Sequence, residues 1–202
     1  MSLLSKVTEM SWATPGIDES RQSYRFSDKS AKRVALTMFL AVVTSLFFLF
    51  IMAYAERMEL GDWNPLAEPR ILWFNTALLA LASFAMQKAR RVAAAGRAAS
   101  GWLGLSGVLV IGFLVGQLAA WSILNAEGLY SMANPALAFF VVLTALHGLH
   151  LLGGLFVWGR TLQRSLRGVE IAELQPTIDL CAVYWHYLLL IWVVLFVLLL
   201  NT

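Results

Sequence analysis

Charged residues are scarce in this chain and are confined to short stretches. Of the 202 residues, 13% are charged and 59% are hydrophobic, whereas a soluble domain is about a quarter charged and about half apolar. Five windows contain no Asp, Glu, Lys or Arg: 34–55, 71–87, 101–126, 128–159 and 180–202. Because a helix needs roughly 20 apolar residues to cross a bilayer, each window can hold a membrane-spanning helix, and little chain remains for a soluble domain.

Other absences exclude several kinds of active site. The single cysteine, Cys181, can form no internal disulfide and has no thiolate partners for a metal site. The apolar windows contain no carboxylate, so a relay of His, Asp and Glu lacks its acids. No activated nucleophile and no phosphate-binding loop is recognisable. We therefore expect this chain to have no catalytic residue, no metal site and no nucleic-acid partner. No apolar segment precedes Val34, so a cleaved signal peptide is not expected.

Basic residues alternate between successive connections. Segments 1–33, 88–100 and 160–167 are rich in Lys and Arg, whereas segment 56–70 is net acidic and segment 127–135 has only Glu127. Basic segments stay on the cytoplasmic side, which predicts a cytoplasmic N-terminus and an external C-terminus.

The predicted fold is an all-α, polytopic bundle of five transmembrane helices. Residues 1–33 are expected to form a cytoplasmic tail, and residues 34–202 the transmembrane domain. The five helices are expected at about 34–55, 71–87, 102–124, 136–159 and 180–200, which are the charge-free windows trimmed to membrane length.

All three histidines lie in apolar windows. His147 and His150 are three residues apart and share one helix face, with Gly154 one turn further on. A short connection favours antiparallel neighbours, so His186 of the last helix could approach His150. Hydrogen-bonded histidines inside a bundle are the favoured interpretation. The alternative is a b-type haem with two axial imidazoles. A proton relay through the histidines is a less favoured interpretation, because the windows contain no carboxylate.

The third window carries a helix-packing pattern. Gly112 and Gly116 form a GxxxG pair, and Ala120 continues the same face. Small residues at this spacing let helices approach closely. Gln117 is the one strongly polar side chain near the middle of this window, and we interpret it as an interhelical hydrogen-bonding group rather than a transport residue.

Four of the five windows carry motifs that resemble a known family. HGLHLLGG at 147–154 and YWHYLLLIW at 184–192 resemble the signatures of the last two helices of subunit III of the haem-copper terminal oxidases. WFNTALLALAS at 73–83 and GFLVGQLAAW at 112–121 resemble its Asn-Thr helix and its Gln-containing helix. The first helix matches by position only. The chain is similar to the short, five-helix form of this subunit.

The resemblance implies a non-catalytic subunit of a cytochrome c oxidase-type complex in a bacterial cytoplasmic membrane. Such a subunit stabilises catalytic subunit I, is expected to meet subunit II, and holds phospholipid at the interface of an oxygen-reducing, proton-translocating enzyme. It binds no cofactor, and haem and copper belong to its partners. The matching residues are then lipid-binding or bundle-structural, with Gly112, Gly116, Ala120 and Gly154 in helix packing: Asn75, Gln117, His147, His150, Trp185 and His186.

Several alternatives remain open. The chain could serve a quinol oxidase or a nitric oxide reductase, whose accessory subunits share these motifs, or it could be a b-haem anchor, a small transporter or an assembly factor. It also departs from the family at three positions. The family usually has a carboxylate near Thr44 and at the positions of Ala120 and Leu189, where this chain has none, so a proton-collecting role is not expected.

Overall fold

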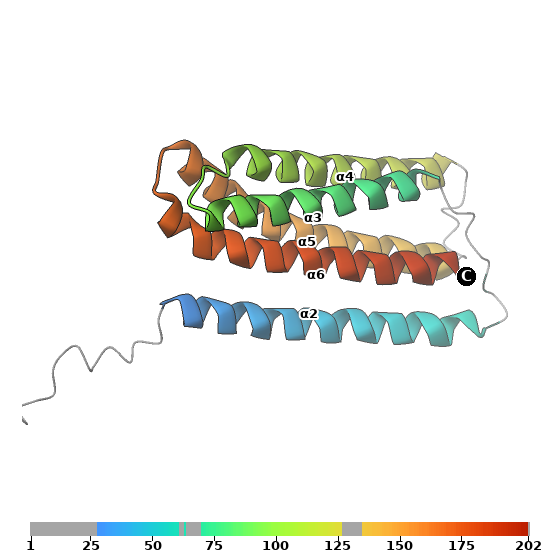
Figure 1. Ribbon diagram of the computed structural model, residues 1–202. Helices are drawn as coiled ribbons and strands as arrows, with labels where there is room; N and C mark the ends of the chain where they lie inside the picture. The colour runs from blue at the N-terminus through green and yellow to red at the C-terminus, as the bar shows by residue number, and fades with distance from the viewer. Residues whose placement is uncertain (1–27, 61–62, 64–69, 127–134, 202) are drawn as a thin grey trace, which may run out of the picture. The chain divides into compact units, whose positions relative to one another are not determined.

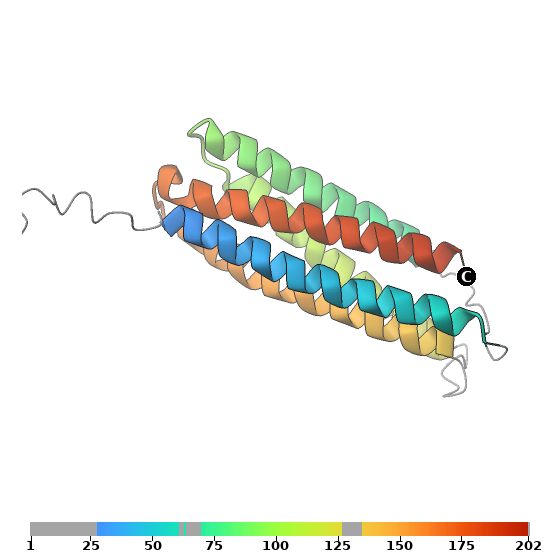
Figure 2. The same ribbon diagram turned by 90° about the horizontal axis from the view of Figure 1, so that it is seen from below.

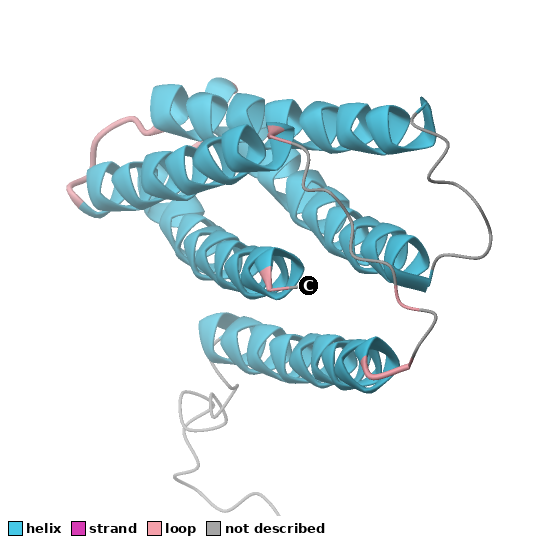
Figure 3. Ribbon diagram, turned by 90° about the vertical axis from the view of Figure 1, so that its right-hand side faces the viewer, coloured by secondary structure: helices cyan, strands magenta, loops and turns pink. Residues whose placement is uncertain are grey.

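The computed structural model describes residues 28–60, 63, 70–126 and 135–201. They form five helices, and no strand occurs among them (Figure 3), so the predicted all-α class is confirmed. Residues 1–27 of the expected tail and most of the connection around Glu127 lie outside the described residues. The helices are α2 (Asp28–Met58), α3 (Ile71–Ala94), α4 (Ser100–Ala126), α5 (Pro135–Leu166) and α6 (Ile171–Leu200).

Each helix encloses the range expected for it and is longer than that range. The largest differences are at the α5–α6 connection, where α5 continues to Leu166 and α6 begins at Ile171. Charged residues end an apolar window without ending a helix, and Arg164 of α5 pairs with Glu173 of α6 at 3.2 Å. Pro176 lies inside α6, in its second turn, where the missing backbone N–H removes one hydrogen bond of the helix.

Four of the five helices are long and apolar enough to cross a membrane: α4, α5, α6 and residues Ala31–Met58 of α2. α3 is not among them, because its apolar run is short and already contains Asn75, Ser83 and Gln87 before the basic residues begin. Length and composition therefore support four of the five expected spans.

Two glycines end α3 and α5 in the same way. Gly96 and Gly168 have φ of 70° and 78°, the left-handed region that glycine adopts without strain. After α3, Gly96 N–H donates to Ala93 O and Arg97 N–H donates to Val92 O, at 2.9 and 3.1 Å. Gly168 and Val169 repeat this pattern after α5. These Schellman ends make two short connections, which Figure 1 shows at the same end of the α3–α6 helices.

Contacts divide the chain after Phe39. Residues 28–39 are the first turns of α2, and Leu40–Thr202 is a separate compact unit. Within that unit α3 packs against α4 and α6, and α5 packs against the same two helices (Figures 1 and 2). Three buried residues of α3 are alanines: Ala82, Ala85 and Ala89. Their side chains are small, so the backbones of neighbouring helices can approach closely.

Candidate functional site

His147 is fully buried in a cage of aromatic rings. Its ring centroid lies 5.3 Å from that of Trp192, 5.8 Å from Phe113 and 6.5 Å from Phe47. These rings come from α6, α4 and α2, so His147 stands where side chains of four helices meet. Among the residues that the structure describes, neither ring nitrogen of His147 has a hydrogen-bond partner.

His150 is half-buried one turn further along α5. Its Nδ1 lies 2.7 Å from Leu146 O, and its ring centroid lies 5.6 Å from that of Phe47. The Tyr184 hydroxyl of α6 donates to the backbone carbonyl of His150 at 2.9 Å. The α5 histidines therefore lie at a junction with α2 and α6.

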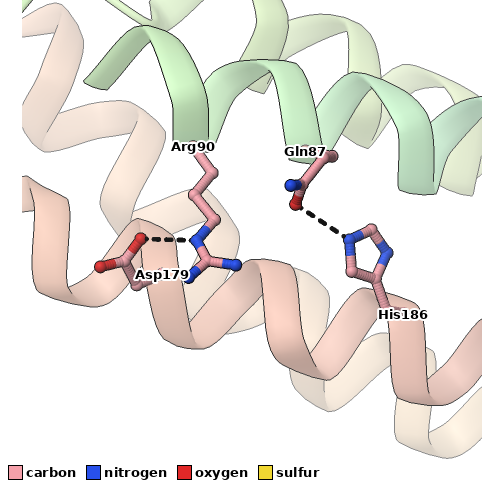
Figure 4. A network of polar contacts seen from close by, with 4 residues as sticks. All are labelled: Gln87, Arg90, Asp179 and His186. Carbon is pink, nitrogen blue, oxygen red and sulfur yellow. Dashed lines mark hydrogen bonds and ion pairs between the residues drawn. The ribbon is translucent and has the colours of Figure 1, made fainter. Parts of the chain in front are cut away.

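His186 points to a different helix. Its Nε2 lies 3.1 Å from Gln87 Oε1 (Figure 4). Its Nδ1 is hydrogen-bonded to the Ser83 hydroxyl, so both nitrogens engage side chains of α3. His186 therefore faces α3, although α6 packs against both α3 and α5.

Near His186, Arg90 Nε of α3 donates to Asp179 Oδ1 of α6 at 2.9 Å (Figure 4). Sequence reasoning missed this ion pair because Asp179 and Arg90 lie just outside the apolar windows. We refer to Gln87, Arg90, Asp179 and His186 as the α3–α6 polar face.

Asn75 and Gln117 meet between α3 and α4. Both are buried, and Asn75 Nδ2 lies 3.5 Å from Gln117 Oε1. The Asn75 carboxamide rests on Gly116, where a Cβ would come 2.1 Å from Asn75 Oδ1. A Cβ at Gly112 would meet Leu78 at 3.5 Å, and Ala120 is buried. The predicted small-residue face therefore lies against α3.

Trp185 and Gly154 meet between α5 and α6. A Cβ at Gly154 would lie 2.5 Å from the Tyr184 ring and 3.2 Å from the Trp185 ring. Trp185 is buried. Gly107 of α4 likewise leaves room for a ring, because a Cβ there would overlap the Trp158 side chain of α5. Trp158 Nε1 donates to Leu103 O at 2.9 Å. Nothing in the spacing of Gly107 distinguished it from the outward-facing glycines of the same helix.

Three further hydrogen bonds join helices. Trp121 Nε1 donates to Thr144 Oγ1 at 3.0 Å, and Trp192 Nε1 donates to Thr76 Oγ1 at 2.9 Å. Thr44 Oγ1 lies 2.9 Å from the Tyr187 hydroxyl. Thr44 is one of the three positions where the resembled family has a carboxylate, and here its hydroxyl connects α2 to α6.

A groove of about 310 Å³ lies between α4 and α5. Its walls are almost entirely apolar, and Leu118 and Leu149 on them are exposed. Gly148 leaves space on the α5 side. Apart from that glycine, no sequence pattern indicates this groove. The lining residues are Leu114, Gln117, Leu118, Trp121, Thr144, Ala145, Gly148, Leu149 and Leu152.

The described residues contain no cluster of three or more His, Cys, Asp or Glu that could hold a metal ion. The described side chains serve mainly to pack the helices together, through aromatic contacts, close approaches at glycines and a few buried hydrogen bonds. The surface carries the α3–α6 polar face and the apolar groove between α4 and α5.

Comparison with known proteins finds subunits of respiratory oxidases among the similar chains. Over 180 residues the chain is 30% identical to cytochrome c oxidase subunit 3 of Synechocystis sp., covering 81% of this chain and 72% of that protein. It is 27% identical over 132 residues to cytochrome bo(3) ubiquinol oxidase subunit 3 of Pseudomonas aeruginosa, covering 65% of this chain and 60% of that protein. For the corresponding protein of Pseudomonas putida the values are 28% over 97 residues, 48% and 46%. No protein-family model matches the chain.

Proposed function

Because the chain belongs to the subunit III family of the haem-copper terminal oxidases, we propose that it stabilises the catalytic subunit of a respiratory oxidase without catalytic residues of its own. The resemblance seen in its helix motifs is thereby confirmed. The observation that carries the proposal is the 30% identity to a cytochrome c oxidase subunit 3 over 81% of this chain. That match extends across several helices, so it concerns the whole bundle and not one motif.

The proposed topology has five spans, with α3 as the least apolar one. Both Schellman connections, at Gly96 and Gly168, lie at one end of α3–α6 and are flanked by arginines (Figure 1). The positive-inside rule makes that end cytoplasmic, which puts the N-terminus inside and the C-terminus outside. The membrane is the cytoplasmic membrane of a bacterium, and the partners are catalytic subunit I and subunit II, which carry the haem and copper.

Phospholipid is the proposed occupant of the groove between α4 and α5. Its apolar walls and the exposed Leu118 and Leu149 suit an acyl chain. The motif residues Asn75 and His147 are buried between helices and do not line the groove, so their proposed role is structural. Gln117 lies on the groove wall and is hydrogen-bonded to Asn75.

Proton handling inside the membrane is not part of the proposal. Thr44, Ala120 and Leu189 have no carboxyl group at the three family positions. Thr44 bonds to Tyr187 and Ala120 is buried, so both positions support helix packing.

Removal of the subunit tests the proposal. The oxidase without this chain should begin turnover at a rate near that of the intact enzyme and then lose activity sooner, because a catalytic subunit without its packing partner is less protected. Oxygen consumption during sustained turnover measures both quantities, and adding back the subunit is the control. Unchanged working lifetime, or loss of initial proton pumping at unchanged electron flux, would contradict the proposal.

The quinol oxidases are the second candidate, because two of the similar chains are subunits of cytochrome bo(3) ubiquinol oxidases. The stabilising role is the same in either complex. Assaying the isolated complex with reduced cytochrome c and with ubiquinol separates the two, since only one donor should sustain rapid oxygen consumption.

A further inference from the structure

The α3–α6 polar face lies on the outer surface of the bundle. The His186 side chain is exposed although it belongs to an apolar span. The side chains of Arg90 and Asp179 are 41% and 22% exposed. The same stripe of the two helices carries exposed apolar side chains, among them Phe84 and Leu190. Polar groups at membrane depth are costly when lipid surrounds them, so a surface of this kind is expected to be covered.

The polar face has more hydrogen-bond donors to offer than acceptors. Gln87 accepts from His186 through Oε1, which leaves its amide N–H groups with no partner among the described residues. Arg90 uses Nε for Asp179, which leaves the terminal guanidinium nitrogens as further donors. The remaining acceptor is the second oxygen of Asp179. A complementary surface therefore presents oxygen acceptors.

Depth distinguishes a protein partner from a lipid headgroup. Asp179 and His186 are seven residues apart on α6, which is about 10 Å along the helix axis. When the Arg90–Asp179 pair lies at the cytoplasmic boundary, His186 lies well inside the hydrocarbon, beyond the reach of a phosphate group. Two polar positions about two turns apart match the seven-residue spacing of side chains on one face of a second, nearly parallel helix.

We infer that the α3–α6 polar face binds a transmembrane helix of the catalytic subunit that carries oxygen acceptors about two turns apart. One acceptor, an amide or carboxyl oxygen, meets Gln87 beside His186, and an acidic group meets Arg90 at the cytoplasmic boundary. The inference rests on the proposed function, and it goes further by assigning the docking surface and the chemistry of the helix that covers it.

Photocrosslinking in the intact complex tests the assignment. A benzoylphenylalanine replaces Phe84 or Leu190 beside the polar face, and, as a matched control, Leu118 or Leu149 at the α4–α5 groove. All four side chains are similarly exposed, at 55–63%. The inference predicts crosslinks to the catalytic subunit from the first pair and crosslinks to lipid from the second.

A second arm tests the chemistry. An interhelical hydrogen bond in a membrane is worth about 0.6 to 2 kcal/mol, so the double variant Gln87→Leu/His186→Leu should retain the catalytic subunit in detergent about threefold to thirtyfold less well. The single variant His186→Gln leaves Gln87 in place and keeps a donor and an acceptor at position 186. It should therefore retain the catalytic subunit nearly as well as the unchanged chain.

The outcomes separate this inference from the proposed function. Crosslinks to the catalytic subunit from the α4–α5 positions alone, or lipid crosslinks alone from Phe84 and Leu190, overturn the docking surface and leave the subunit role intact. Retention unaffected by the double variant overturns the assigned chemistry. A chain that isolates without any oxidase subunit overturns both the inference and the proposed function.

Discussion

Polar side chains in the apolar helices of this protein differ in how well their hydrogen-bonding groups are satisfied. Thr144 and Thr76 each accept from a tryptophan of another helix, and His186 has a partner at each nitrogen. His147 has aromatic neighbours instead. An unsatisfied buried donor costs about 1–3 kcal/mol, so the two histidines should respond differently to the same substitution.

The substitution of leucine for histidine provides that comparison. His147→Leu removes a ring without partners and keeps a similar volume, so the free energy of unfolding should stay the same or rise by about 1 kcal/mol. His186→Leu breaks two side-chain contacts to α3 and should lower it by about 1 kcal/mol. Denaturant titration of the complex in detergent measures both. A loss at His147 as large as that at His186 would reveal a buried partner, such as an ordered water.

At the scale of helices, the closest contact between α3 and α4 is at Gly116. A methyl group there would overlap the buried Asn75 carboxamide, whereas at Gly112 it would meet Leu78 in ordinary contact. Gly116→Ala should therefore destabilise the bundle by about 1–3 kcal/mol through overpacking. Gly112→Ala, the matched control on the same face, should change the free energy of unfolding by less than about 1 kcal/mol. Equal effects at the two glycines would contradict the observed packing.

The sequence predicted the existence and order of the helices, because charge-free windows report directly where an apolar environment surrounds the chain. It did not predict where α5 ends and α6 begins, since Arg164 and Glu173 are solvated and still helical. Gly168 was the available signal, as its left-handed conformation ends α5.

The sequence predicted which residues belong to the candidate site, but it did not predict most of the contacts between them. Small-residue spacing identified the face of Gly112 and Gly116, but not the Asn75 side chain that fills it. Hydropathy could not say which of its two neighbours α6 turns His186 toward, because that choice depends on the rotation of the packed helix. The α3–α6 polar face and the α4–α5 groove arise from tertiary packing, for which the sequence carried no local pattern.

For the whole molecule, the number of spans decides on which side the chain ends. With five spans the two termini lie on opposite sides of the membrane, and with α3 outside the membrane they lie on the same side. We expect an alkaline phosphatase fused after the C-terminus to be active, because that enzyme requires the oxidising side of the membrane. A fusion in the connection at Gly96 should be inactive and serves as the control. An inactive C-terminal fusion would exclude α3 as a span in the proposed topology.

The central claim is that this chain is an accessory subunit whose polar residues hold a bundle together beside a larger enzyme. Isolation of the tagged chain from its native membranes in mild detergent tests it most directly. We expect a complex in which a much larger subunit carries all of the haem and copper, and in which this chain, once separated, has no visible absorption. A chain that purifies alone, or that retains a reducible b-type haem band after separation, would contradict it.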